Sequence, residues 1–408
     1  MAKPKIRFKG YTDDWEQRKL GEVCSRVQGN DGRMELPTLT ISAGNGWMKQ
    51  EDRFSGNIAG KEQKNYTLLK KGELSYNHGN SKLAKYGTVF SLQTYEEALV
   101  PRVYHSFKVE KGNANFIEYY FATKLPDREL GKLISSGARM DGLLNIGYDD
   151  FMGISLLLPR TQEQDCIARY FRKVDMLITL HQRKCEETKK LKKYMLQKMF
   201  PQNGQTVPEI RFAGFTDAWE QRKLGEVGTV KSGMGFPDIE QGGTEGVPFF
   251  KVSDMNIKGN EHELVVANNY VTSEQITRKR WNVINDVPAI LFAKVGAAVM
   301  LNRKRLVRSP FLLDNNTMVY IFDKKIWDCD FGKTLFETID LTKLTQVGAL
   351  PSYNASDVEN VSIIIPDRAE QEIVGKYFRQ LDHLITLHQH KCEQLQNMKK
   401  FMLQNMFV

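Results

Sequence analysis

Polar and basic side chains gather in two parts of this 408-residue chain, and their types suggest contact with a polyanion. Arginine, lysine, asparagine and serine side chains hydrogen-bond to the phosphates and base edges of nucleic acids. The candidate contacts in the first half of the chain are His78, Asn80, Ser81, Lys82, Lys85 and Arg139. Those in the second half are Lys251, Lys294, Asn302, Arg303, Lys304, Arg305 and Arg308. Solvated loops can have the same composition, so each residue is a hypothesis.

The densest group of positive charge lies between two apolar, strand-like runs. Arg303, Lys304, Arg305 and Arg308 fall within six residues of one another. We expect some of these side chains to bind phosphate and at least one to reach a base. The net charge of +9 and the isoelectric point near 9.1 also favour a polyanionic partner. Charge alone does not separate nucleic acid from a membrane surface or an acidic protein.

Residue combinations that would predict catalysis are missing from the sequence. It lacks the N-P-P-(F/Y/W) and D-P-P-Y tetrapeptides that hold a flipped adenine, and it lacks a G-x-x-x-x-G-K-(S/T) phosphate loop. Pro126–Leu130 begins like a nuclease motif but has Gly131 where the lysine belongs. Spacing suggests no Ser/His/Asp or Cys/His set. We therefore expect a chain without catalytic activity.

The cysteines and the hydropathy pattern indicate a cytoplasmic protein. The five cysteines stand at positions 24, 166, 185, 329 and 392, without a C-x-x-C pair. Buried, reduced thiols are the expected state, and no metal is expected to bind. No apolar run approaches the length of a membrane span, and the N-terminus has no apolar signal region.

The elements that position these residues come from a duplication. Ile6–Val23 and Ile210–Val227 match at 15 of 18 positions. Leu158–Phe200 and Ile365–Phe407 form the second repeated pair. The chain is therefore one unit of roughly 205 residues written twice. The stretches between the repeats share little sequence, which suggests one scaffold carrying two different binding regions.

Each long repeat predicts a helix with a heptad seam. Pro159 and Pro366 precede the helices, which at about 38 residues would be roughly 57 Å long. A seam of this length must pair with another helix, and the other copy is the obvious partner. His181 and His388 occupy equivalent seam positions, where they would fix the register or, alternatively, bind a metal. The predicted seam residues are Ile167, Phe171, Val174, Ile178, His181, Val374, Phe378, Leu381, Ile385 and His388.

The inserts between the repeats predict mixed α/β domains. Short β-like runs punctuated by glycine and asparagine precede one helical stretch in each insert, Phe116–Leu133 and Phe331–Thr342. Each insert closes with a glycine-containing loop and a final strand. The predicted boundaries are 1–23, 24–158, 159–200, 201–227, 228–365 and 366–408, in which 24–158 and 228–365 are the two inserts.

Three pieces in this order resemble the specificity subunit of type I restriction–modification systems. They are IRF-x-G-(Y/F)-T-D-x-W-E-Q-R-K-L-G-E-V, the glycine-containing loop before the final strand, and P-x-x-x-E-Q entering a long helix. The resemblance implies two target-recognition domains joined by two antiparallel helices that form a coiled-coil spacer. It implies that each domain reads one half of a bipartite, asymmetric target in double-stranded DNA.

The same resemblance implies particular partners. Two methyltransferase subunits would bind this chain, and two restriction subunits would join through them. S-adenosylmethionine, ATP and Mg²⁺ would bind those partners, and no cofactor would bind this chain. One departure is that the proximal loop, SSGARMDGLLNIGYDDF, lacks the proline of the distal GALPSYNASDV. The alternative is a duplicated adaptor that does not read DNA, which would lack the steep salt dependence of phosphate binding.

Overall fold

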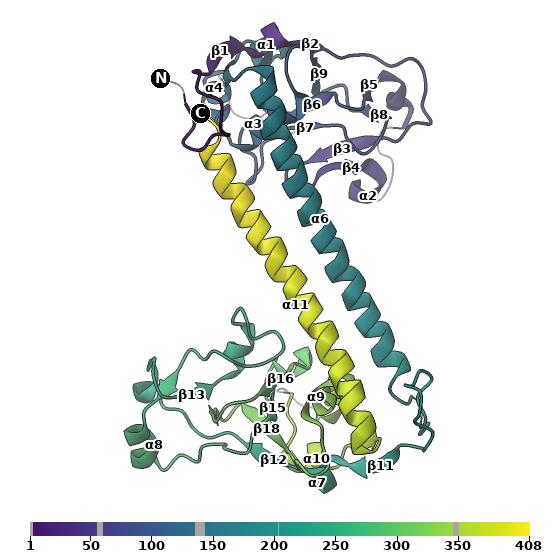
Figure 1. The fold of residues 1–408 in the computed structure, drawn as a ribbon, viewed down its shortest axis with the longest axis vertical. Helices are drawn as coiled ribbons and strands as arrows, with labels where there is room; N and C mark the ends of the chain where they lie inside the picture. The colour runs from purple at the N-terminus through teal and green to yellow at the C-terminus, as the bar shows by residue number, and fades with distance from the viewer. Residues whose placement is uncertain (1–2, 55–59, 135–142, 203, 346–350) are drawn as a thin grey trace. The chain divides into compact units, whose positions relative to one another are not determined.

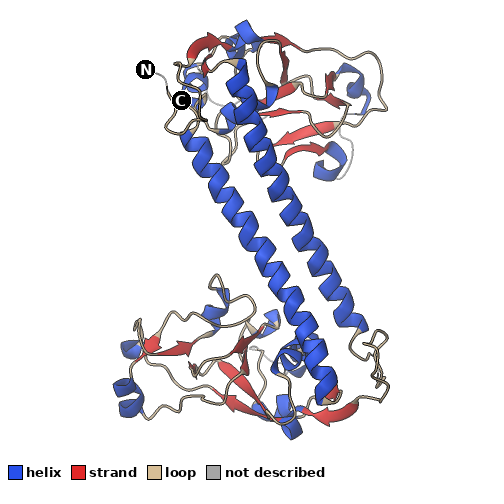
Figure 2. Cartoon of the chain, viewed as in Figure 1, coloured by secondary structure: helices blue, strands red, loops and turns tan. Residues whose placement is uncertain are grey.

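The computed structural model describes residues 3–54, 60–134, 143–202, 204–345 and 351–408. The chain divides into two compact units (Figure 1). Unit 1 comprises Met1–His181 with His390–Val408, and unit 2 comprises Gln182–Gln389. Each unit contains both sheets and helices (Figure 2), so the predicted mixed α/β fold is confirmed.

Unit 1 is built around a four-stranded antiparallel sheet in the order β2-β9-β6-β7. Strand pairs β3-β4, β5-β8 and β1-β10 surround it. The strands are β1 (Glu16–Lys19), β2 (Cys24–Arg26), β3 (Leu39–Ser42), β4 (Gly46–Lys49), β5 (Thr67–Lys70), β6 (Leu74–Asn77), β7 (Thr88–Ser91), β8 (Glu97–Val100), β9 (His105–Val109) and β10 (Ser155–Leu158). The helices before the first long helix are α1 (Leu20–Val23), α2 (Gln50–Phe54), η1 (Gly60–Asn65), α3 (Ala114–Ala122), α4 (Asp127–Lys132) and α5 (Tyr148–Met152).

Unit 2 repeats this plan with the four-stranded sheet β12-β18-β15-β16. A three-stranded sheet, β14-β13-β17, and the pair β11-β19 accompany it. The strands are β11 (Glu220–Lys223), β12 (Gly228–Ser232), β13 (Val247–Phe250), β14 (Tyr270–Val271), β15 (Ala289–Ala293), β16 (Lys304–Val307), β17 (Leu312–Leu313), β18 (Thr317–Phe322) and β19 (Ser362–Ile365). The short helices are α7 (Leu224–Val227), η2 (Asp238–Glu240), η3 (Val252–Asn256), α8 (Ser273–Lys279), η4 (Val299–Leu301), α9 (Cys329–Thr338), η5 (Leu341–Leu344) and α10 (Ala355–Glu359).

The repeated sequence forms the same frame in both units. The Ile6 amide donates to the Asn405 carbonyl at 2.9 Å, and the Ile210 amide donates to the Lys198 carbonyl at 2.9 Å. Both arginines that follow, Arg7 and Arg211, make bidentate ion pairs with buried glutamates. The strong repetition of these segments therefore has a structural cause, because each copy fastens the end of one long helix to the start of the other.

The two long helices are α6 (Thr161–Lys198) and α11 (Arg368–Asn405). Their predicted seam residues Ile167, Phe171, Val174, Ile178, Val374, Phe378, Leu381 and Ile385 are all buried. In unit 1, Val174 and Ile178 pack with Leu395. In unit 2, the Cys185 thiol lies 3.9 Å from the Ile385 carbonyl oxygen. Within each unit the helix segments run antiparallel, because later residues of the first helix meet earlier residues of the second. The contacts are Phe171–Phe407 and Ile178–Cys392 in unit 1, and Cys185–Ile385 and Phe200–Phe378 in unit 2. His181 and His388 are half-buried.

The helical stretch predicted at Phe116–Leu133 is wrong in its extent. The structure divides it into α3 and α4, with Lys124 between them in the left-handed conformation at φ 66°. Pro126 then stands at the start of α4, because proline fits a helix start but disrupts a helix interior.

Two further predictions concern the thiols and the membrane. All five cysteines are free thiols, with Cys24, Cys185 and Cys392 buried and Cys166 and Cys329 half-buried. Among the described residues, no helix combines the length and apolar character that a membrane span requires.

Candidate nucleic-acid interface

The first polar loop connects β6 to β7 and comprises residues 78–87, here called loop 1. Its start is held to the segment that leads into α5, because Gly79 and Leu143 form a β-bridge and the Leu144 amide donates to the His78 carbonyl at 2.9 Å. Its end requires glycine. Gly87 has φ 82°, and a Cβ there would lie 2.5 Å from the Asn77 carbonyl oxygen. Loop 1 is therefore a fixed structure at both ends.

The second polar loop connects β15 to β16 and comprises residues 294–303, here called loop 2. Val295 and Ser352 form a β-bridge, and the Gly296 amide donates to the Pro351 carbonyl at 2.9 Å. The Tyr353 hydroxyl donates to the Ala293 carbonyl at 2.5 Å. Loop 2 is thus held by the segment that leads into α10.

The two loops are topological equivalents. Each connects the third strand of a four-stranded sheet to the fourth, and each is bridged to the segment before the last short helix of its insert, α5 or α10. Their sequences differ, HGNSKLAKYG in loop 1 and KVGAAVMLNR in loop 2. The two loops are therefore anchored in the same way but carry different side chains. This arrangement is expected of two regions that bind different partners or different sequences. The sequence did not predict the anchoring role of Tyr353, although this residue lies in the distal loop GALPSYNASDV.

The structure describes twelve of the thirteen predicted contact residues and places them in four groups. Those exposed in loop 1 are Asn80, Ser81, Lys82 and Lys85. Those half-buried in unit 2 are Lys251, Lys294, Asn302, Arg303, Lys304 and Arg305. Arg308 is exposed but pairs with Glu263 and Asp330. His78 is buried, and Arg139 lies outside the described residues.

His78 differs from the prediction because it is buried at the start of loop 1, where it is 5% exposed. Its Nδ1 lies 2.8 Å from the Leu144 carbonyl oxygen, and its Nε2 lies 3.0 Å from the Val103 carbonyl oxygen. The His105 ring is 4.9 Å away, and its Nε2 lies 2.9 Å from the Ile146 carbonyl oxygen. Burial lowers the pKa of His105 to about 4. The two histidines fasten the anchor of loop 1 and are not placed to touch a ligand.

Lys304 and Arg305 also differ from the prediction of direct contact. The Lys304 ammonium donates to the Ile339 carbonyl at 2.5 Å and to Asn302 Oδ1 at 2.8 Å. Burial lowers the pKa of Lys304 to about 8. Arg305 Nε donates to the Asn260 carbonyl at 2.7 Å. These two side chains therefore link the end of loop 2 and the start of β16 to segments that are distant in the sequence.

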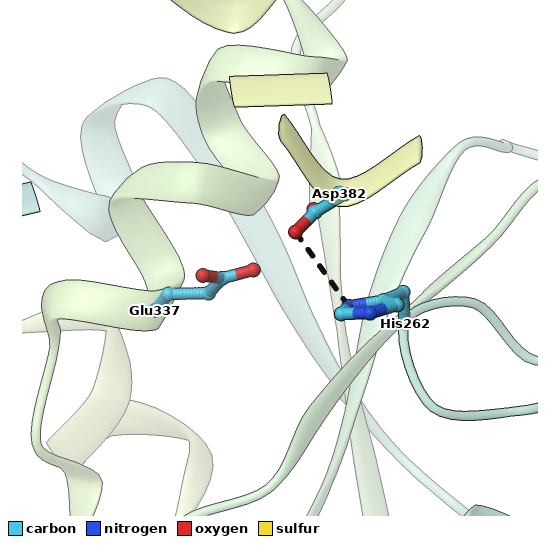
Figure 3. A group of neighbouring side chains, drawn as sticks. All are labelled: His262, Glu337 and Asp382. Atoms are coloured by element: carbon cyan, nitrogen blue, oxygen red, sulfur yellow. Dashed lines mark ion pairs between the residues drawn. The ribbon is translucent and has the colours of Figure 1, made fainter. Parts of the chain in front are cut away.

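A cluster of charged side chains in unit 2 joins the insert to the long helices (Figure 3). His262, Glu337 and Asp382 offer ligand atoms within 4.8 Å of one another, as a metal site would require. Lys192, however, lies 2.6 Å from carboxylate oxygens of both Glu337 and Asp382, and Lys333 pairs with Asp382 as well. Although burial opposes it, the charges of Lys333 and Lys192 hold the pKa of Asp382 below its usual value. The two ammonium groups therefore compensate the carboxylates, and a cation would have to displace them.

Unit 1 has a smaller version of this cluster at the equivalent helix positions. Lys399 lies 2.5 Å from Asp175, and the Tyr119 hydroxyl donates to the same carboxylate at 2.7 Å. The lysine and aspartate of the long helices are thus common to both units. The insert supplies Tyr119 from α3 in unit 1, and it supplies Lys333 and Glu337 from α9 in unit 2.

Residues 216–397 match the family model described as the type I restriction modification DNA specificity domain. The specificity subunit of the type I restriction enzyme MjaVIII from Methanocaldococcus jannaschii is 22% identical over 318 residues, which cover 72% of this chain and 70% of that protein.

Two solved structures share the fold. The S subunit of a type I restriction-modification system from M. genitalium is 13% identical, with a TM-score of 0.65 over 100% of this chain and 99% of that chain. A chain from a type I R-M system, solved to explain complex assembly and conformational transition, is also 13% identical. Its TM-score is 0.50 over 95% of this chain and 96% of that chain.

Proposed function

We propose that this chain is a specificity subunit of a type I restriction–modification system. In this proposal, each of its two inserts reads one half of a bipartite, asymmetric DNA target. Loop 1 and its surroundings would contact one half-site, and loop 2 and its surroundings would contact the other. Phosphate contacts would position each domain, and side chains at the loop tips would distinguish the bases.

The observation that carries this proposal is the difference between the two loops on equivalent anchors. The frames match at 15 of 18 positions in the short repeat, whereas HGNSKLAKYG and KVGAAVMLNR have little in common. A chain that reads two different half-sites needs different donors and acceptors at the same place in two similar domains. An adaptor for two identical partners has no need to diversify these loops.

We also propose that the long helices bind two methyltransferase subunits at two equivalent surfaces. Exposed apolar side chains on α6 recur on α11 at positions related by the repeat. They form the pairs Leu180 and Leu387, Leu191 and Met398, and Tyr194 and Phe401. Exposed apolar side chains that recur in this way support protein contacts, because isolated solvated helices gain nothing from them.

Catalysis in this proposal belongs to the partners. The sequence lacks the methyl-transfer, ATPase and nuclease motifs named above, so methyl transfer would occur on the methyltransferase subunits. Restriction subunits would join the complex through the methyltransferase subunits. S-adenosylmethionine, ATP and Mg²⁺ would then act without binding to this chain.

Methylome sequencing of a host that expresses this chain with its methyltransferase tests the proposal. The expected result is one methylated motif with two different half-sites separated by unread bases. A non-palindromic motif in one continuous block would contradict bipartite reading, and no new methylation with a purified, assembled complex would contradict DNA specificity. Binding to random duplex DNA provides the control, because phosphate binding gives a steep negative slope of log affinity against log salt and an adaptor gives none.

A further inference from the structure

Loop 1 and loop 2 each expose a large apolar side chain among basic ones. Leu83 in loop 1 is 70% exposed, and Met300 and Leu301 in loop 2 are each 57% exposed. Exposed apolar side chains are common on protein surfaces, so one alone would need no explanation. Here they occur in topologically equivalent loops of two inserts whose sequences differ. This shared feature suggests that the exposed apolar side chains have the same function in both loops.

The backbone of loop 2 holds its apolar pair outward. Val299 is buried in the domain core, and the single turn of η4 then turns Met300 and Leu301 to the surface. The turn closes at Asn302, which has φ 48°. The Asn302 side chain fixes this conformation, because its Nδ2 donates to the Ile339 carbonyl at 3.3 Å and its Oδ1 accepts from the Leu341 amide at 3.1 Å.

The backbone of loop 1 presents Leu83 in a comparable way. The Ala84 amide donates to the Ser81 carbonyl at 3.1 Å, and the Ser81 amide donates to the Ala84 carbonyl at 3.1 Å. This tight turn buries Ala84 while Leu83 stands outside it. Lys82 and Lys85, both exposed, flank the leucine. Basic side chains on either side would hold phosphates while the leucine faces a groove.

We propose that Leu83, and in the second domain the Met300–Leu301 pair, contact the C5-methyl group of a thymine in each half-site. This inference rests on the proposed function and deepens it. The thymine methyl is the apolar group that base pairs present in the major groove, and apolar side chains are its usual partners. A contact of this kind lets an apolar side chain at a loop tip contribute to specificity without a hydrogen bond.

The test replaces thymine by deoxyuridine, which differs only by that methyl group, at one position at a time in both half-sites. Binding is measured with the complex of this chain and its methyltransferase subunits. The wild-type complex should lose about fourfold in affinity at one thymine of each half-site, as burial of one methyl group predicts. Leu83→Ala should abolish that discrimination in one half-site, and Met300→Ala with Leu301→Ala should abolish it in the other.

Two exposed residues outside these loops provide matched controls. Leu125→Ala in unit 1 and Ile239→Ala in unit 2 remove side chains that are 43% and 87% exposed, and both should retain wild-type discrimination. Thermal unfolding of all variants checks that folding is unchanged.

Three results would overturn the inference. The first is that the loop variants lose the same affinity as the wild type when each thymine is replaced by deoxyuridine. The second is that one half-site contains no A·T pair. The third is that the wild-type complex loses no affinity at any deoxyuridine. If Leu83→Ala reduces DNA bending with no deoxyuridine effect, the leucine is a wedge between base steps and the methyl contact is wrong. A wild-type complex that binds random and target duplex equally would reject the proposed function itself, and the inference with it.

Discussion

Neighbouring basic residues in loop 2 and β16 have different environments and different hydrogen-bond partners. The guanidinium of Arg303 donates to the exposed side chain of Asn256, whereas the ammonium of Lys304 is enclosed by carbonyl and amide oxygens. Four basic residues within six positions suggested one group of DNA contacts. The structure divides them, because Lys304 and Arg305 point toward backbone carbonyls and Arg308 is paired with two carboxylates.

We expect Arg303→Ala and Lys304→Ala to affect different measurements. Arg303→Ala should weaken binding to all duplexes and reduce the salt slope by about one, as loss of a phosphate contact does, with little change in stability. Lys304→Ala should lower the free energy of unfolding by about 1–3 kcal/mol, because the half-buried oxygens of Asn302 and Ile339 lose a charged donor. Salt-dependent binding and chemical denaturation separate the two, and a stable Lys304→Ala variant with a reduced salt slope would contradict the assignment.

The half-buried His105 predicts a loss of stability in mild acid. Burial lowers its pKa from 6.5 to about 4, so between these values the unfolded state binds more protons than the folded state. Stability therefore falls as the pH falls from about 6.5 to 4, by on the order of 3 kcal/mol from this residue. His105→Gln keeps a donor for the Ile146 carbonyl but does not titrate. Chemical denaturation at both pH values should show a smaller change in the free energy of unfolding for the variant than for the wild type.

At the scale of elements, the helix of each insert is fastened to the long helices by a network with common and variable members. Asp382 and Lys192 in unit 2 correspond to Asp175 and Lys399 in unit 1. The variable members come from α9 in one case and α3 in the other. The long helices therefore offer the same polar contact to two different inserts, which explains how one frame carries both.

Removal of one charge from this network should be costly in unit 2. The carboxylate of Asp382 is 10% exposed and pairs with both Lys192 and Lys333, so Asp382→Asn leaves two ammonium groups with reduced compensation. We expect a loss of about 3–5 kcal/mol in the free energy of unfolding, as for other broken buried pairs. The matched control is Asp175→Asn, where the carboxylate is 34% exposed and the expected loss is smaller. Equal losses in the two variants would contradict this account.

At the scale of the whole molecule, the duplication separates what is shared from what is specific. The short repeats and the long helices form the same frame contacts in both units. Nearly identical frames cannot distinguish two half-sites, so in the proposed function any asymmetry of the DNA target must come from the inserts.

Replacement of 24–157 by a second copy of 228–364 should therefore give a target with two copies of one half-site. The graft is compatible with the frame, because it brings Lys333 and Glu337 to Asp175 and Lys399, which are equivalents of Asp382 and Lys192. Methylation mapping of this variant is the measurement. Retention of the original first half-site would show that specificity does not lie in the inserts.

The repeat, the two long helices and the α/β character of the inserts could be predicted from local sequence patterns. Heptads such as Val374, Phe378 and Leu381 repeat within a few residues, so a local pattern suffices to predict which face of a helix is buried. The resemblance to type I specificity subunits required no tertiary information, because the repeated pieces are contiguous and occur in a fixed order.

Which polar residues face outward depends on contacts between segments that are distant in the sequence. His78 and Lys304 are the same residue types as true nucleic-acid contacts, but carbonyl oxygens of Leu144 and Ile339, far away in sequence, receive them. The pairing of Asp382 with Lys192 likewise joins residues 190 positions apart. The sequence gives the chemistry of each side chain. Its hydrogen-bond or ion-pair partner, however, comes from a segment that it meets only on folding. For this reason, the residues available for DNA contact could not be predicted from the sequence.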